Sequence, residues 1–192
     1  MRSLILSLFI IIGISAASAQ SLLDSFSQNL AAMGRYKAKF AIVVDGQTVG
    51  GQYIVDGSNF YVAAEGVELY VADGVKYEVN SAKREVVVDS AASLGGDLLS
   101  NPAHCFDNLK LQFNATDSVE AGVKMVKLTP KEGSGESINI YADSRGELPG
   151  RIVYNFDNGS ITILFASIAP YSAALPVFEQ TRYAEYEVID MR

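Results

Sequence analysis

One histidine and one cysteine, His104 and Cys105, stand side by side, and the chain has no other residue of either type. A cysteine nucleophile needs a histidine base within hydrogen-bond reach. Consecutive side chains on a helix point in different directions, so this spacing does not favour such a pair. Free cysteine is also among the residue types most often buried. We therefore predict a buried Cys105 and a half-exposed His104, neither with a catalytic role.

Other arrangements of reactive residues are equally scarce. The sequence has no metal-ligand spacing, no Gly-x-Ser-x-Gly nucleophile motif and no glycine-rich phosphate loop. Asp45, Asp56, Asp73 and Asp157 fall in predicted turns, where aspartate favours the turn conformation. A carboxylate pair for acid–base catalysis stays open as an alternative, although no spacing indicates one. The expectation is a protein that is not an enzyme, with no catalytic residue, no metal ligand and no cofactor.

The N-terminus has the three parts of a cleavable secretory signal. Met1 and Arg2 form a short charged start, residues 4–14 are almost unbroken apolar sequence, and Ala17-Ser18-Ala19 supplies small residues before a cut at Gln20. The apolar run is shorter than the roughly 20 residues of a spanning helix, so a retained membrane anchor is the less favoured alternative. No cysteine follows the cut, so no lipid attachment is expected there. We expect residues 1–19 to be removed and residues 20–192 to form one exported domain.

The amino-acid composition argues against two classes of binding partner. The chain has 15 basic and 22 acidic residues, and the signal removes only Arg2, so residues 20–192 carry a net charge of −8. This acidic balance argues against nucleic acid and against anionic lipid headgroups. A single cysteine cannot form an internal disulfide, so the fold must depend on its hydrophobic core.

The periodicity of apolar residues predicts a mainly β fold. Residues 21–33 read as one amphipathic helix, with Ser21 and Asp24 as a capping box and Gly34 as its stop. Short alternating segments with tight turns then predict antiparallel strands. The predicted strands span residues 36–44, 49–55, 60–64, 68–72, 75–79, 85–88, 109–115, 123–128, 137–142, 151–156 and 160–166, with a last extended stretch at 186–189. Between residues 90 and 107 the pattern breaks into two short helical pieces.

About eleven strands are too many for a flat sheet in so short a chain, so we predict a strongly curved antiparallel sheet or an incomplete β-barrel. The N-terminal helix and a short helical lid at residues 90–107 would bury their apolar sides on its concave face.

Several segments, taken in order, resemble the periplasmic outer-membrane lipoprotein carrier family (LolA-type). The resemblance covers nearly all of residues 20–192 and includes the signal and the first helix. It rests on Gly51-Gln52-Tyr53-Ile54-Val55, Asn59-Phe60, Ala72-Asp73-Gly74-Val75-Lys76-Tyr77, Val126-Lys127-Leu128-Thr129-Pro130-Lys131, Phe178 and the final Tyr186-Glu187-Val188-Ile189-Asp190-Met191-Arg192.

The resemblance implies an incomplete barrel of eleven strands under a helical lid, whose apolar cavity shelters the acyl chains of lipoproteins on their way to the outer membrane. It implies a periplasmic protein, which we expect to be monomeric, with acylated lipoproteins and an inner-membrane lipoprotein-releasing transporter as partners. Members commonly place a lid-holding arginine shortly after the second strand. The matching position here is Gly57, which favours the alternative of an envelope sensor or a lipid- or protein-binding module on the same scaffold.

Strand alternation indicates which side chains face the concave side, with Leu111, Ile138 and Ile152 among them and Tyr70 facing away. Plain core packing is the competing interpretation for each residue taken singly. The predicted lipid-binding residues are Phe40, Ile42, Tyr53, Phe60, Leu69, Val71, Leu94, Leu98, Phe113, Ile140 and Tyr154.

Overall fold

The computed structural model describes residues 21–95, 98–133 and 136–192. The expected signal, residues 1–19, lies outside the described residues. The helices are α1 (Leu22–Ala32) and α2 (Cys105–Gln112), with 3₁₀ turns η1 (Ala91–Ser93) and η2 (Gln180–Tyr183). The strands are β1 (Arg35–Val44), β2 (Gln47–Asp56), β3 (Asn59–Ala64), β4 (Val67–Ala72), β5 (Val75–Asn80), β6 (Glu85–Ser90), β7 (Phe113–Glu120), β8 (Val123–Pro130), β9 (Ser137–Ala142), β10 (Pro149–Phe156), β11 (Gly159–Pro170) and β12 (Glu187–Asp190).

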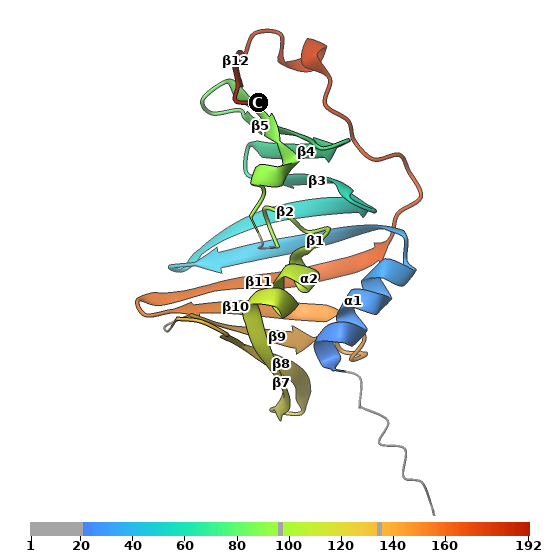
Figure 1. The fold of residues 1–192 in the computed structure, drawn as a ribbon, viewed down its shortest axis with the longest axis vertical. Helices are drawn as coiled ribbons and strands as arrows, with labels where there is room; N and C mark the ends of the chain where they lie inside the picture. The colour runs from blue at the N-terminus through green and yellow to red at the C-terminus, as the bar shows by residue number, and fades with distance from the viewer. Residues whose placement is uncertain (1–20, 96–97, 134–135) are drawn as a thin grey trace, which may run out of the picture.

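All twelve strands form one open sheet in the order β12-β6-β5-β4-β3-β2-β1-β11-β10-β9-β8-β7. Figure 1 shows α1 and α2 on one face of this sheet, while the chain after β11 runs back along its side toward β12. The two halves meet where β1 pairs with β11, from Tyr36 opposite Pro170 to Val43 opposite Thr162. The predicted curved, mainly antiparallel sheet with an N-terminal helix is confirmed.

Helix α1 begins and ends where the sequence predicts. The Ser21 hydroxyl accepts a hydrogen bond from the Asp24 amide at 3.1 Å and donates one to the Asp24 carboxylate at 2.7 Å. Such a cap satisfies amides that the first helical turn leaves without partners. Gly34 follows the helix with a φ of +66°, which glycine adopts at little cost. The buried side of this amphipathic helix is the stripe of Leu23, Phe26 and Leu30.

The segment before β7 differs from the prediction. Residues 109–112 were expected to begin a strand, but they complete α2, because Cys105, Phe106 and Leu109 share one buried side at helical spacing. Leu111 was expected on the concave side and is instead 74% exposed. The first of the two predicted helical pieces is reduced to η1 in the part of the chain that the structure describes.

The C-terminal segment adds a strand that the sequence suggested only as an extended stretch. β12 pairs in parallel with β6, from Glu187 opposite Glu85 to Asp190 opposite Val88. The twelfth strand covers an edge that would otherwise expose unpaired backbone groups. Between β11 and β12, Tyr171, Phe178, Tyr183 and Tyr186 pack on the side of the sheet that the two helices do not cover.

The sheet therefore has two apolar faces. We call the buried residues beneath α1 and α2 the covered cluster, and those beneath the C-terminal segment the tail cluster. Tyr53 and Val55 of β2 belong to the covered cluster and Ile54 to the tail cluster, as strand alternation requires. Tyr70 does face away from the helices, as expected, but it is buried in the tail cluster.

A glycine of β2 makes room for an aromatic ring on the covered face. Phe40 of β1 lies opposite Gly51, and a Cβ added at Gly51 would come within 2.5 Å of the Phe40 ring and 3.0 Å of the Ala63 carbonyl oxygen. We expect Gly51→Ala to lower the free energy of unfolding by about 1–3 kcal/mol, the usual cost of overpacking. Urea unfolding followed by circular dichroism measures this change.

The neighbouring glycine is a matched control for that variant. A Cβ at Gly50 would meet no atom within 4 Å, and its φ lies in the ordinary range. Gly50→Ala should therefore be neutral or stabilise the strand by about 0.5–1 kcal/mol. Equal effects of the two substitutions would show that the Phe40 ring does not depend on the space above Gly51.

Candidate functional site

The covered cluster brings together all of the residues that alternation selected as a candidate lipid-binding surface. Six of them are buried within it: Phe40, Tyr53, Phe60, Val71, Leu98 and Ile140. The other five pack against it and are partly buried: Ile42, Leu69, Leu94, Phe113 and Tyr154. These residues come from both halves of the sheet and from the segment that precedes α2, so together they form one continuous apolar surface. Their role in binding lipid stays a prediction.

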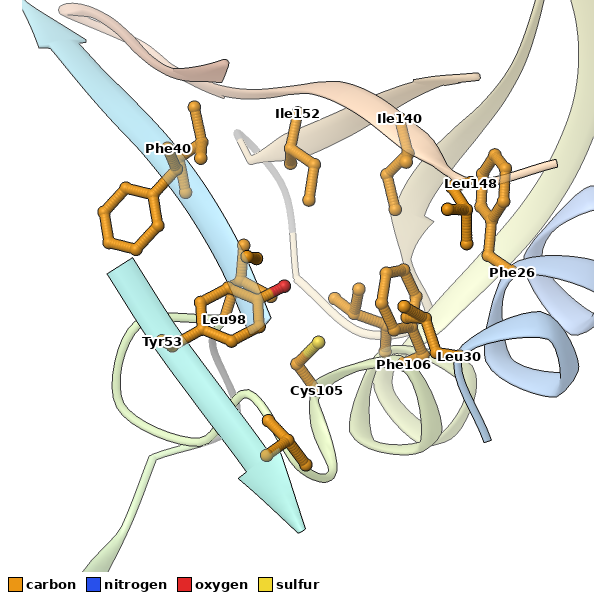
Figure 2. Close-up of a cluster of buried hydrophobic side chains, with 14 of the residues drawn as sticks. Phe26, Leu30, Phe40, Tyr53, Leu98, Cys105, Phe106, Ile140, Leu148 and Ile152 are labelled. Atoms are coloured by element: carbon orange, nitrogen blue, oxygen red, sulfur yellow. The ribbon is translucent and has the colours of Figure 1, made fainter. Parts of the chain in front are cut away.

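The helices contribute residues that were not among the predicted set. Figure 2 shows Phe26 and Leu30 of α1 and Phe106 of α2 pointing toward the cluster that the sheet residues form. The apolar residues of α1 recur at helical spacing in the sequence, so its buried side could be predicted. The buried side of α2 was missed because residues 109–115 were predicted to be a strand. Of the residues that the structure describes, none with a charged side chain is buried. The site is therefore an apolar layer between a sheet and two helices.

Two cavities open on the covered face, one near each end of α2. The first has a volume of about 300 Å³ and lies among the end of α1, the β2–β3 turn and the residues around the start of α2. The second has a volume of about 310 Å³ and lies between the end of α2 and strands β9 and β10. Leu30, Tyr36, Val55, Gly57, Pro102 and Phe106 line the first, and Leu109, Phe113, Ile138, Tyr154 and Phe156 line the second. Each volume reaches the lower end of the range found for small-molecule sites.

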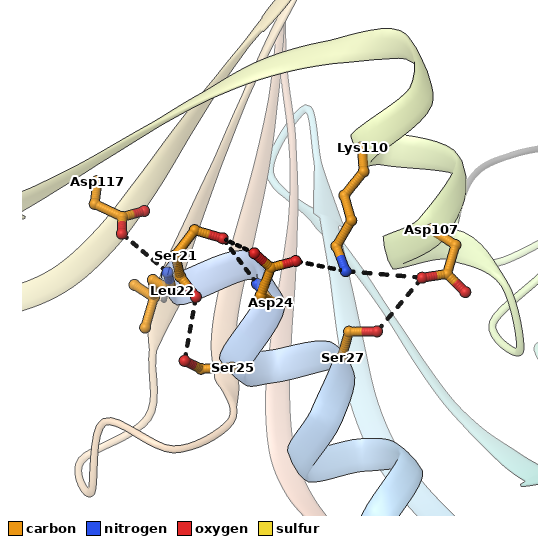
Figure 3. Close-up of polar contacts among 8 residues, drawn as sticks. All are labelled: Ser21, Leu22, Asp24, Ser25, Ser27, Asp107, Lys110 and Asp117. Atoms are coloured by element: carbon orange, nitrogen blue, oxygen red, sulfur yellow. Dashed lines mark hydrogen bonds and ion pairs between the residues drawn. The ribbon is translucent and has the colours of Figure 1, made fainter. Parts of the chain in front are cut away.

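Polar contacts at the surface hold the two helices together (Figure 3). The Lys110 ammonium group lies 2.8 Å from one Asp24 oxygen and 3.8 Å from an Asp107 oxygen. Hydrogen bonds from Lys110 and then Ser21 hold the pKa of Asp24 below its ordinary value. On its other side α1 is tied to the sheet, because the Leu22 amide donates to the Asp117 carboxylate of β7 at 2.9 Å. The contact between α1 and α2 thus rests on an exposed ion pair over apolar packing.

Gly57, the position matched to the family's lid-holding arginine, lines the first cavity. No arginine is close to it in the sequence, but the pairing of β1 with β2 places Arg35 beside Asp56. The Arg35 guanidinium also donates to the Ala173 carbonyl at 2.8 Å, so it joins the sheet to the C-terminal segment. In this structure the ion pair between Lys110 and Asp24 joins α2 to α1.

Of the two residues considered first for chemistry, Cys105 lies as predicted, whereas His104 is more exposed than expected. Cys105 is buried in the covered cluster, and the preceding His104 is exposed. Within residues 21–95, 98–133 and 136–192, no three His, Cys, Asp or Glu side chains come together as metal ligands. None of the helices in this described part of the chain combines the length and hydrophobicity that crossing a lipid bilayer demands.

Comparisons with known proteins give relatives in structure only. No protein-family model matches the sequence, and no curated protein matches it. An uncharacterized conserved protein from Thermus thermophilus superposes with a TM-score of 0.55 at 11% identity, covering 90% of this chain and 99% of that one.

Two further solved structures match less closely. A LolA superfamily protein from Nitrosomonas europaea has a TM-score of 0.42 at 10% identity and covers 88% of this chain and 98% of that one. MucB of Pseudomonas aeruginosa in complex with MucA has a TM-score of 0.42 at 16% identity, and the match covers 90% of this chain and 64% of that one. At these identities the likeness concerns the fold alone. The fold predicted from the sequence, an open antiparallel sheet with helices over one face, is confirmed.

Proposed function

We propose that this protein is a periplasmic carrier that shelters the acyl chains of lipoproteins between the sheet and its two helices. The observation that carries this proposal is the covered cluster, an apolar surface that spans both halves of the sheet and has a cavity at each end of α2. An acyl chain that entered either cavity would meet apolar side chains along the whole covered face.

The energetics of acyl chains fit such a surface. Burying hydrocarbon stabilises the complex by about 0.8 kcal/mol per CH₂, so a chain of ordinary length needs no further specific contact to be held. A carrier must also release its cargo. A partly exposed ion pair such as Lys110 with Asp24 contributes only about 0.2–1 kcal/mol, so α2 is held mainly by its apolar packing, which an entering acyl chain would replace.

The proposed carrier role also implies which partners the protein has. Acylated lipoproteins would be the cargo, an inner-membrane lipoprotein-releasing transporter would supply them, and a monomeric carrier would pass them toward the outer membrane. The expected export signal and the absence of a cysteine after its cut agree with a protein that moves between membranes.

A binding measurement with a fluorescent fatty acid tests the proposal. On mixing 11-(dansylamino)undecanoic acid with the purified protein, we expect a blue-shifted, enhanced emission that saturates at one or a few probes per chain. Absence of saturable binding would contradict the carrier role.

The second candidate function is an envelope sensor or interaction module on the same scaffold. The observation that favours it is Gly57, which stands where the carrier family commonly has its lid-holding arginine. Under that function the covered face is simply the core, and the protein would bind a protein partner without an acyl chain.

A further inference from the structure

Tyr53 has an unusual place in the middle of the covered cluster. Its side chain is fully buried, and its ring is surrounded by other aromatic rings. The ring centres lie 6.1 Å from Tyr36, 5.9 Å from Phe40 and 6.4 Å from Phe165, with edge-on contacts to the first and the last. These contacts fix the ring on β2, so the hydroxyl has a defined direction.

The Tyr53 hydroxyl is directed toward α2 but has no hydrogen-bond partner among the described residues. Figure 2 shows it pointing into the cluster, on the side where Cys105 lies. Burying a hydroxyl without a partner costs about 1–3 kcal/mol, so such groups are uncommon in folded proteins. An orphaned donor in a candidate binding site is the kind of group that a ligand would satisfy.

Several other buried tyrosines of this chain differ from Tyr53 because their hydroxyls have hydrogen-bond partners. Tyr61 and Tyr183 each donate to the Glu68 carboxylate at 2.6 Å, and the Tyr70 and Tyr183 hydroxyls are 2.8 Å apart. Tyr141 donates to Glu120 at 2.7 Å. All of these lie away from the covered cluster. The unpartnered hydroxyl therefore occurs in the one layer where a ligand is proposed to bind.

Tyr53 has a neighbour in the lining of each cavity. Tyr36 lines the first and Tyr154 lines the second, and both are close enough to Tyr53 for their charges to affect its ionisation. Burial, followed by Tyr36, Cys105 and Tyr154, raises the pKa of Tyr53 well above its ordinary value, so the group stays protonated and can donate. A molecule extending from one cavity toward the other would pass this hydroxyl.

We propose that the Tyr53 hydroxyl donates a hydrogen bond to a neutral carbonyl oxygen, of an ester or amide, in an acyl ligand bound beneath α2. The inference rests on the proposed carrier function and adds the polar group that the site would recognise. An ionised carboxylate is not expected there, because no buried charged side chain is present among the described residues to compensate it. The ligand class is thus an acylated molecule whose ester or amide end enters the site together with its chain.

The test compares Tyr53→Phe with the wild-type protein and with Tyr61→Phe, which removes a hydroxyl from the tail cluster. Binding is measured by displacement of the dye N-phenyl-1-naphthylamine with methyl decanoate, which has an ester carbonyl, and with 1-chlorodecane, which has none. For Tyr53→Phe we expect about five- to tenfold weaker binding of methyl decanoate, the value of one hydrogen bond, and unchanged binding of 1-chlorodecane within twofold. Tyr61→Phe should leave both affinities unchanged.

Thermal unfolding without ligand supplies a second readout. Because Phe fits the same space without an orphaned donor, Tyr53→Phe should unfold at the same temperature as wild type or higher, whereas Tyr61→Phe should unfold lower. A clear loss of melting temperature in Tyr53→Phe would overturn the proposal, since it would show that the hydroxyl already has a partner such as a buried water. Equal changes for the two ligands would overturn it too, while leaving the carrier function in place. Failure of both ligands to displace the dye from wild type would instead contradict the carrier function itself.

Discussion

Replacing Phe113 by glutamate is expected to weaken binding of the fluorescent fatty acid at least about tenfold while leaving the fold intact. Phe113 is the first residue of β7, lines the second cavity and packs against the covered cluster. When an acyl chain binds, a carboxylate at this position must lose its hydrating water, and burying an unpaired charge costs several kcal/mol. If the carboxylate stays hydrated instead, it prevents the acyl chain from entering the cavity. Because Phe113 is only partly buried, the charge can reach solvent when no ligand is present. Fluorescence titration measures the affinity, and circular dichroism checks the fold.

Leu111→Glu is the matched control for this variant. Leu111 lies two residues earlier on α2 and is 74% exposed, so the same added charge is placed outside the site. It should leave the affinity within twofold of wild type. Equal losses in both variants would indicate a general effect of charge, and no loss in Phe113→Glu would remove the second cavity from the binding site.

The second large effect is expected on stability, from Glu68→Gln beside the tail cluster. The Glu68 carboxylate accepts hydrogen bonds from Tyr61 and Tyr183 at 2.6 Å and from Tyr70 at 3.1 Å, and Arg182 lies 3.3 Å away. Tyr183 and Arg182 belong to the C-terminal segment, so this network fastens that segment to the sheet. Hydrogen bonds to a charged group contribute about 1.5–3 kcal/mol each, and a neutral amide retains only part of them. We expect the free energy of unfolding at pH 7 to fall by about 2–3 kcal/mol in urea titrations.

The stability difference should depend on pH with a definite sign. Burial raises the pKa of Glu68, but hydrogen bonds from Tyr183, Tyr61 and Tyr70 outweigh it and hold the pKa below the ordinary value of 4.5. A carboxylate with a lowered pKa stabilises the fold fully above its unfolded-state pKa, about 4.3, and loses that contribution as the pH falls through the folded-state pKa. The gap between wild type and Glu68→Gln should therefore be constant from about pH 8 to pH 6 and shrink below about pH 4.

Glu78→Gln, at an exposed glutamate of the neighbouring strand β5, serves as the control and should change stability by less than about 0.5 kcal/mol. A gap between wild type and Glu68→Gln that stays constant down to pH 3 would show that the carboxylate charge is not what fastens the segment.

Most of the sheet could be predicted from the sequence because its short apolar segments are separated by tight turns. In the Asp45-Gly46 and Asp73-Gly74 turns both residues have positive φ, the geometry that two-residue hairpins require. These local signals fix the register of each hairpin without any knowledge of distant contacts. Alternation along the strands placed side chains such as Phe40 and Ile140 on the covered face.

What could not be predicted depends on contacts between distant segments. Residues 109–112 alternate apolar and polar side chains like a strand, yet packing of Cys105, Phe106 and Leu109 against the sheet makes them helical. The pairing of β12 with β6 joins segments about a hundred residues apart, which no local pattern reveals. The ion pair between Asp24 and Lys110 and the missing partner of the Tyr53 hydroxyl likewise exist only after folding.

The most direct test of the acyl-carrier role is to identify what the protein holds in its own cells. The protein would be isolated without detergent from the envelope of cells that make it naturally, and its complexes analysed by native mass spectrometry followed by lipid extraction. The carrier role predicts a bound molecule with acyl chains, above all an acylated lipoprotein, that is lost from the Phe113→Glu variant and kept by Leu111→Glu. Recovery of the protein with only a non-acylated protein partner, or with no bound molecule and no affinity for the fluorescent fatty acid, would contradict it.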